Sequence, residues 1–213
     1  FMLTFGSDPN AKVTKKSKSP LSFHPIALIF GLLSFVSYLV EGAVGDWSAL
    51  YLFEDKGIVI EEAVMGVMLF NGTMCIGRLL GNRLGKHLTS KQVVVGGYLL
   101  GSIAMGLIVF LPGHASMYTY LLLGISLAMI VPNLFSAMGE QNVIPMTQAV
   151  ATSTMLGYMG ILMGPALIGF IAHGTSLTVA FIVLTTLLVV SAGIGKYAYH
   201  LMSKDCGLSE EQI

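Results

Sequence analysis

The chain has 213 residues, of which 54% are hydrophobic and only 10% are charged, and its mean hydropathy is +0.80. Soluble domains carry about 25% charged residues, so this composition excludes a soluble domain and predicts an integral membrane protein. The 11 Lys and Arg residues balance the 11 Asp and Glu residues, which leaves no basic surface for nucleic acid. Two cysteines are too few for a disulfide scaffold.

Six apolar segments are long enough to cross a bilayer, which takes roughly 20 helical residues. They cover residues 25–52, 63–84, 93–111, 117–138, 149–172 and 177–198. Short connections between them hold the charges and the turn-forming residues. The predicted fold class is therefore all-α integral membrane, with six transmembrane helices bundled over residues 25–200 and a cytoplasmic tail over 201–213.

The segments at the start of the chain suggest an earlier helix. Residues 1–6 are apolar and are predicted to end a preceding transmembrane helix, while 7–24 form a lysine-rich cytoplasmic loop. With both ends of this segment cytoplasmic, ten Lys and Arg residues fall on the inner side and only Lys56 falls outside. Cytoplasmic loops are rich in Lys and Arg, so this bias supports the six-span topology. Trp47 and Tyr51 are predicted to lie at the outer interface, where aromatic residues gather.

The first span carries the polar residues that matter most for function. An ionisable side chain is costly in hydrocarbon and is a functional hypothesis by default. Glu41 lies roughly 9 Å inside the outer interface by helical rise. Ser34, Tyr38, Glu41, Gly45 and Ser48 recur at spacings of three and four, which places them on one face. That face predicts the lining of a polar cavity, or else a Glu41 that reaches out to the headgroups. Asp46 lies on another face, where it caps the outer end or lines the path.

Other spans carry similar polar stripes. Asn71 and Arg78 are seven residues apart on one face of the second span. Asn133 follows Pro132 in the fourth span, where proline removes a backbone donor and predicts a kink. Tyr158 belongs to the fifth span. The two asparagines are either ligands or hydrogen-bonding contacts between helices. The first, second, fourth and fifth spans are therefore predicted to border a wet central path, and the third and sixth to be peripheral.

A basic segment at the inner end of the second span, residues 77–86, reads G-R-L-L-G-N-R-L-G-K. It resembles the signature loop of the major facilitator superfamily, which often reads G-R-L-x-G-D-R-x-G, with Asn82 here in place of the Asp. The first span, with its stretch E-G-A-V-G-D-W-S-A-L-Y over residues 41–51, is also similar to the seventh helix of a bacterial, sugar-permease-like branch. From the lysine-rich loop onward, the chain resembles the second half of such a 12-helix transporter.

The resemblance implies alternating access, in which two six-helix halves rock around a central site. It implies a multi-pass protein of the bacterial inner membrane whose partners are a small-molecule solute, protons, the bilayer and a missing N-terminal six-helix half. A buried carboxylate has its pKa raised toward the range in which it exchanges protons, which makes Glu41 the proton-coupling candidate. Tyr38, Asn71, Asn133 and Tyr158 are the candidates for hydrogen bonds to the solute.

The same resemblance assigns the residues of segment 77–86 to a cytoplasmic gate. In that gate Arg78 and Arg83 would pair with acidic groups or helix ends when the inner side closes. The gate residues are Gly77, Arg78, Gly81, Asn82, Arg83 and Gly85.

Three alternatives remain open. The chain could be a complete six-span transporter that works as a homodimer, or a receptor that kept a transporter fold without transport. An intramembrane enzyme is disfavoured, because the nearest match to an aspartyl-protease element, Gly42-x-x-Gly45-Asp46, has the wrong spacing and no second deep Asp. The five histidines fall at span ends or in loops and form no H-E-x-x-H pattern. No metal, cofactor or ATP site is expected.

Overall fold

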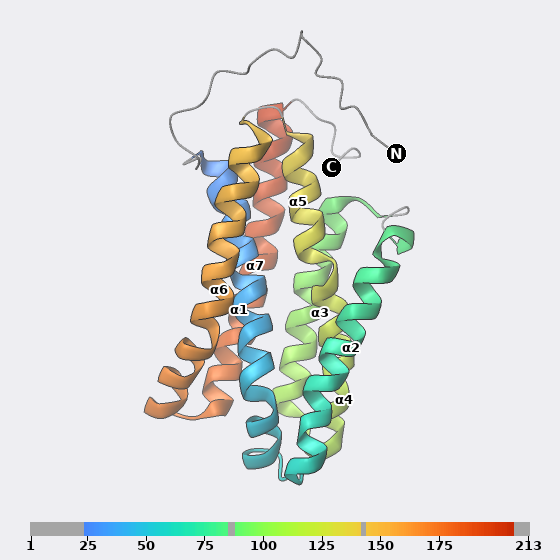
Figure 1. The fold of residues 1–213 in the computed structure, drawn as a ribbon, viewed down its shortest axis with the longest axis vertical. Helices are drawn as coiled ribbons and strands as arrows, with labels where there is room; N and C mark the ends of the chain where they lie inside the picture. The colour runs from blue at the N-terminus through green and yellow to red at the C-terminus, as the bar shows by residue number, and fades with distance from the viewer. Residues whose placement is uncertain (1–23, 85–87, 142–143, 207–213) are drawn as a thin grey trace, which may run out of the picture.

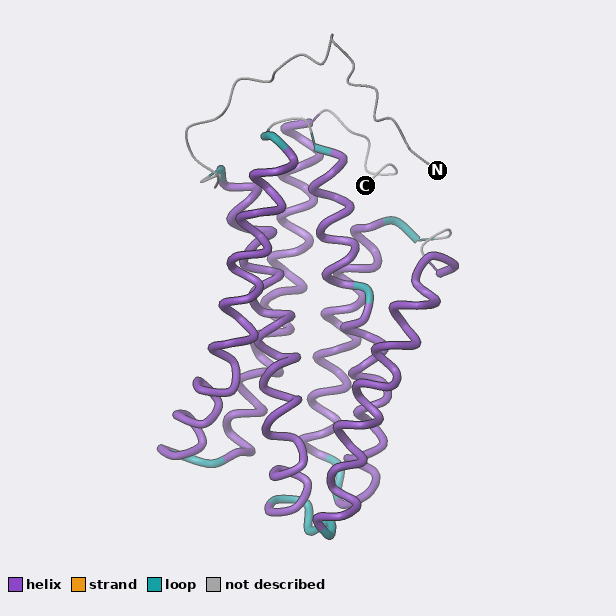
Figure 2. Tube along the Cα trace, viewed as in Figure 1, coloured by secondary structure: helices purple, strands orange, loops and turns teal. Residues whose placement is uncertain are grey.

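The computed structural model describes residues 24–84, 88–141 and 144–206, and these residues form an all-helical bundle (Figures 1 and 2). The elements are α1 (Pro25–Glu54), α2 (Ile60–Leu84), α3 (Ser90–Phe110), α4 (Gly113–Ala128), α5 (Ile130–Glu140), α6 (Met146–Gly174) and α7 (Leu177–Cys206). Six spans within this described part are long and apolar enough to cross a membrane, with α4 and α5 counted as one. The predicted fold class is confirmed. The predicted segment 1–6, and the predicted loop 7–24 except for His24, lie outside the described residues.

The fourth span is interrupted where α4 meets α5. Met129 separates the two helices and Pro132 lies on the first turn of α5. Proline has no N–H to give to the carbonyl one turn earlier, which is the physical reason for a break here. Asn133 lies beside the break, where the Met129 carbonyl accepts both from its side-chain Nδ2 at 2.8 Å and from its backbone N–H at 3.2 Å. The kink that Pro132 predicts is therefore present.

Helix α1 lies between two neighbours that leave part of it uncovered. In Figure 1, α6 lies on one side of α1 and α2 on the other, and both contact it. Helices α3, α4 and α7 complete the bundle: α3 packs on α4 and α7, and α4 packs on α2. Because α2 and α6 make no direct packing contact, the surface of α1 between them is open. This open surface holds the candidate site.

Close contact between α1 and α6 depends on small residues. A Cβ atom added to Gly160 would overlap the backbone carbonyl of Phe35, and one added to Gly164 would overlap that of Leu39. Glycine is the residue that lets two membrane helices come this close. Towards the C-terminal end of α1 the contact is fixed by Trp47, whose Nε1 donates to the carbonyl of Pro165 at 2.9 Å.

The aromatic residues near the C-terminal end of α1 differ in their surroundings. Tyr51 was predicted at the interface, but it is fully buried and stacks on Phe181 with ring centroids 4.2 Å apart. Tyr51 therefore faces the bundle interior, against α7, and its depth at the outer interface stays a prediction. Lys56 donates to the carbonyls of Val109 and Leu111 at 2.6 and 2.9 Å, so it stabilises the end of α3.

A buried hydrogen-bond network joins α3 to α1. The Tyr98 hydroxyl donates to the Leu33 carbonyl at 2.7 Å and lies 2.9 Å from the Ser37 hydroxyl. Since the single Tyr98 proton goes to Leu33, Ser37 is the donor in the second bond. Both Tyr98 and Ser37 are buried, so α3, which the sequence predicts to be peripheral, is tied to α1.

We expect Tyr98→Phe to lower the stability of the protein by about 1 kcal/mol, the usual size of an interhelical hydrogen bond in a membrane protein. The apparent Tm in detergent should fall by about 2–4 °C. Tyr118→Phe is the matched control, because Tyr118 is an exposed tyrosine on α4. Equal Tm values for the two variants would show that the Tyr98 hydroxyl contributes nothing to stability.

Candidate functional site

The open surface of α1 presents a carboxylate to a guanidinium from α2. Arg78 Nη2 donates to Glu41 at 3.1 Å to Oε2 and 3.4 Å to Oε1. Glu41 lies near the middle of α1 and Arg78 about two turns before the end of α2. Their side chains are 22% and 44% exposed, respectively. The two charges are thus paired near the middle of α1, and both side chains remain accessible to a ligand.

The pairing of Arg78 with Glu41 was not foreseen. The sequence predicts Glu41 as a proton carrier and Arg78 as part of a cytoplasmic gate, two separate roles. The long arginine side chain extends from its place on α2 to the middle of α1 and brings both charges into one site. In this conformation Arg78 contacts the predicted proton path. Neither functional role is tested by the pairing.

Two tyrosines lie next to each other on the same surface. The rings of Tyr38 on α1 and Tyr158 on α6 stack nearly parallel, with centroids 6.2 Å apart and 8° between their planes. Tyr158 is 61% exposed. Gly157 permits the approach, because a Cβ at that position would lie 2.7 Å from the Tyr38 ring. The stack presents an aromatic surface with hydroxyl groups one turn from Glu41, since Tyr38 and Glu41 are three residues apart.

The two predicted asparagines bond to their own helices. Asn71 Nδ2 donates to the Val67 carbonyl at 3.0 Å and its side chain is exposed. Asn133 is half-buried and donates to Met129 as described above. Neither amide bridges two helices among the described residues, so the alternative that they join helices is not supported. Each keeps an amide oxygen and a second N–H for a ligand.

Two of the serines predicted to line the cavity are buried instead. Ser34 is buried and donates to the Phe30 carbonyl at 3.1 Å. Ser48 is also buried. Both share the helical face of Tyr38 and Glu41, but neighbouring side chains cover the two ends of that face. Only its middle section, with Tyr38, Glu41 and the exposed Gly45, reaches the open surface.

The remaining predicted residues divide into three groups. Asp46 is exposed on α1, one residue before Trp47, and is not joined to the Glu41–Arg78 pair. Gly77 and Gly81 pack α2 against Ala128 and Met129, so they have a packing role. The side chains of Asn82 and Arg83, and all of Gly85, lie outside the part of the chain that the structure describes.

The formal charges of the site cancel. Glu41 contributes one negative charge and Arg78 one positive charge, and Tyr38 and Tyr158 beside them are neutral polar groups. Within residues 24–84, 88–141 and 144–206 no cluster of three His, Cys, Asp or Glu could hold a metal ion. The arrangement can bind a solute by hydrogen bonds and ring contact, and it can exchange a proton at one carboxylate.

Comparisons with known proteins give relatives over most of the chain. An uncharacterized MFS-type transporter from Yersinia pestis is 41% identical over 168 residues, which is 78% of this chain and 43% of the relative. Membrane protein MosC from Rhizobium meliloti is 30% identical over 78% of this chain and 42% of its own length. The chain therefore spans about two fifths of the relatives it matches. No protein-family model matches it.

The fold has a counterpart among solved structures. The E. coli fucose:proton symporter FucP superposes with a TM-score of 0.71 over 82% of this chain and 43% of the symporter. The two sequences are 16% identical, so this likeness concerns the fold alone. A six-helix bundle of this arrangement makes up a little under half of that transporter.

Proposed function

Because this chain belongs to the major facilitator superfamily and forms one six-helix half of its fold, we propose that it is half of a secondary active transporter. The transporter moves a small, polar, neutral solute by alternating access and couples the movement to protons. The observation that carries the proposal is the Glu41–Arg78 ion pair on the open surface of α1. Charged side chains are costly inside a membrane, and where they occur they usually mark a functional site.

Proton coupling follows from competition for the Glu41 carboxylate. Arg78 donates to both carboxylate oxygens of Glu41, so a proton and the guanidinium compete for the same carboxylate. A proton binds when the pair separates, and the released guanidinium is then free to contact the solute. Proton binding and solute binding are thereby linked through one side chain. In this proposal Glu41 carries the proton. Arg78 contacts the solute only after Glu41 has bound a proton and released the guanidinium.

A neutral solute fits the charge balance of the site. An anion or a cation would leave one unpaired charge in a low-dielectric environment, which is unfavourable. The stacked Tyr38 and Tyr158 rings offer an aromatic surface to the apolar face of a ring, and Asn71 and Asn133 offer amides to hydroxyl groups. Sugars and polyols combine these two properties.

The proposal includes a second six-helix half and a membrane orientation. Helices α2 and α6 flank the open surface and are the least buried of the six spans. Only 28% and 22% of the residues in their apolar stretches are buried. A missing N-terminal half would cover these two helices and close the site from the other side. The lysine and arginine bias favours cytoplasmic ends, in the inner membrane of a bacterium, with the residues of segment 77–86 other than Arg78 in a cytoplasmic gate.

The test is to reconstitute the full-length protein in liposomes loaded with a pH-sensitive dye. Neutral sugars and polyols are added outside one at a time, and the corresponding sugar acid is added in a separate, parallel assay. We expect a neutral solute to acidify the interior in a saturable way, and the acid to have no effect. Uptake without proton movement would contradict the coupling. Binding without uptake would favour a receptor. A full-length mass near 22.7 kDa would favour the homodimer instead of two unlike halves.

A further inference from the structure

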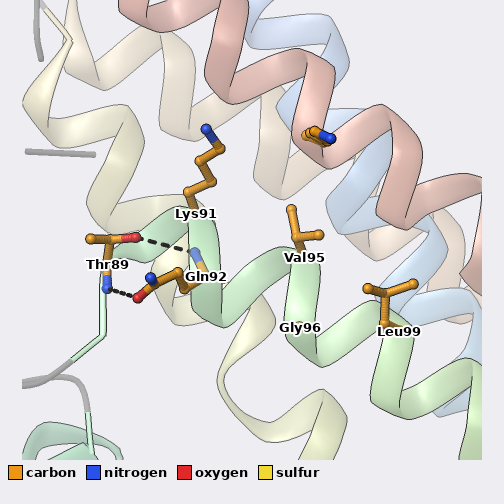
Figure 3. Close-up of a pocket in the computed structure, with 7 residues that line it drawn as sticks. Thr89, Lys91, Gln92, Val95, Gly96 and Leu99 are labelled. Carbon is orange, nitrogen blue, oxygen red and sulfur yellow. Dashed lines mark hydrogen bonds between the residues drawn. The ribbon is translucent and has the colours of Figure 1, made fainter. Parts of the chain in front are cut away.

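A basic cavity lies on the far side of the bundle from the candidate site, between α3 and α7. It has a volume of about 600 Å³. Its lining residues are Thr89, Lys91, Gln92, Val95, Gly96, Leu99 and Lys196. Figure 3 shows Lys91 and Gln92 at the start of α3, with Val95 and Leu99 following along the same helix. The cavity therefore has a polar, basic end and an apolar end.

The basic end combines charges from two helices. Lys91 comes from the first turn of α3 and Lys196 from α7, so each helix supplies one lysine to the lining of the cavity. Thr89 caps α3, with its Oγ1 accepting from the Gln92 N–H at 3.3 Å. The N-terminus of α3 therefore lies at this end of the cavity, and the positive end of its helix dipole adds to the charges of the two lysines. This end is suited to a phosphate group.

The apolar end runs along the membrane-spanning part of α3. Gly96 forms part of its floor, because a Cβ added there would meet no atom within 4 Å. Leu99 is 47% exposed, and about 12 Å of helix separates it from Lys91 by helical rise. A free phosphate ion would leave this part of the cavity empty. An acyl chain attached to a phosphate headgroup would fill it.

We propose that this cavity binds an anionic phospholipid, with its headgroup on Lys91 and Lys196 and an acyl chain along Val95, Gly96 and Leu99. Basic pockets between membrane helices bind such headgroups. The site lies at the end of the bundle where α1 begins and α7 ends (Figure 1), the end that the charge bias assigns to the cytoplasm. The lipid proposal depends on the membrane location of the chain and is independent of the transport activity.

The charge test measures retained phosphatidylglycerol by native mass spectrometry of the full-length protein in detergent. Phosphatidylcholine with the same chains serves as the reference lipid. We expect the Lys91→Gln/Lys196→Gln variant to bind phosphatidylglycerol about thirtyfold more weakly, from two lost lysine contacts. Lys91→Arg/Lys196→Arg keeps the charges and should retain the lipid. Lys204→Gln, at an exposed position on α7 outside the cavity, is the matched control. Equal retention by the double glutamine variant and Lys204→Gln would overturn the proposal.

The acyl-chain test leaves both lysines in place. Gly96→Leu fills the cavity floor and should reduce phosphatidylglycerol binding about tenfold, the cost of displacing one chain from a groove. Gly193→Leu is matched to it, because Gly193 on α7 is also exposed and open but does not line the cavity. Millimolar inorganic phosphate should fail to displace the lipid. Equal binding by the two leucine variants, or displacement by phosphate, would reveal an anion site without lipid and would overturn the proposal.

Discussion

Glu41→Gln is expected to abolish proton-driven uptake while sparing counterflow, the exchange of solute across the membrane without a proton gradient. Glutamine keeps the shape of glutamate but cannot carry a proton. It still accepts a hydrogen bond from Arg78, although the ion pair is gone. In liposomes of the full-length protein, uptake driven by a proton gradient should fall at least about a hundredfold, which corresponds to loss of a required proton-transfer group. Counterflow should stay within about threefold of the unmodified protein.

The matched control is Glu54→Gln on the same helix. Glu54 is the last residue of α1, is exposed and takes no part in the site. Its uptake and counterflow should both stay at the level of the unmodified protein. If Glu41→Gln still accumulates solute against a gradient when protons drive it, Glu41 is not the proton carrier. If both uptake and counterflow are lost, Glu41 holds the solute or the structure of the site instead.

A second variant separates the ion pair from the carboxylate. Arg78→Gln removes the partner that contacts Glu41 at 3.1 Å and leaves the carboxylate able to bind a proton. In the proposal, protons then no longer compete with Arg78, so proton binding is uncoupled from the solute. We expect this variant to keep counterflow at reduced affinity and to lose accumulation. This result would distinguish a coupling role for Arg78 from a gate role at the cytoplasmic end.

The six-span bundle could be predicted from the sequence because every helix crosses the same bilayer. The bilayer imposes a long apolar stretch on each helix and a charge bias on the loops, and both can be read from the sequence. The helices extend a few residues beyond most of the predicted ranges, since polar residues such as Glu61 and Glu62 still occupy the first turn of α2. A hydropathy boundary marks the edge of the hydrocarbon. A helix ends where its backbone hydrogen bonds end, which is often in the headgroup region.

The site was only partly predictable, because helical periodicity identifies a face without identifying the neighbour that covers it. Glu41 and Tyr38 are on the open surface, as their spacing predicts. Ser34 has the same spacing, yet α6 covers it: a Cβ at Gly157 would lie 3.6 Å from the Ser34 Cβ. The Glu41–Arg78 pair was missed for a related reason, since it depends on the tilt of α2 and on the reach of one arginine.

Gly160→Leu is the substitution expected to damage the fold most. The Cβ of any other residue at this position would overlap the Phe35 carbonyl of α1, and a backbone atom cannot move aside as a side chain can. Overpacking of a well-packed interior costs about 1–3 kcal/mol or more, so the apparent Tm should fall by about 5–10 °C or the protein should fail to accumulate. Gly160→Ala should give a smaller loss in the same direction.

Gly72→Leu is the control for this prediction, because a Cβ at Gly72 on α2 meets nothing within 4 Å. Its Tm should remain within about 2 °C of the unmodified protein, as for most exposed positions. The two variants also differ at the site. Pushing α6 away from α1 separates Tyr158 from Tyr38, so Gly160→Leu protein that does fold should bind the solute more weakly. A Gly160→Leu protein with unchanged Tm and unchanged affinity would mean that α1 and α6 do not contact as closely as Gly160 requires, and the aromatic surface of the site would then have to be assembled differently.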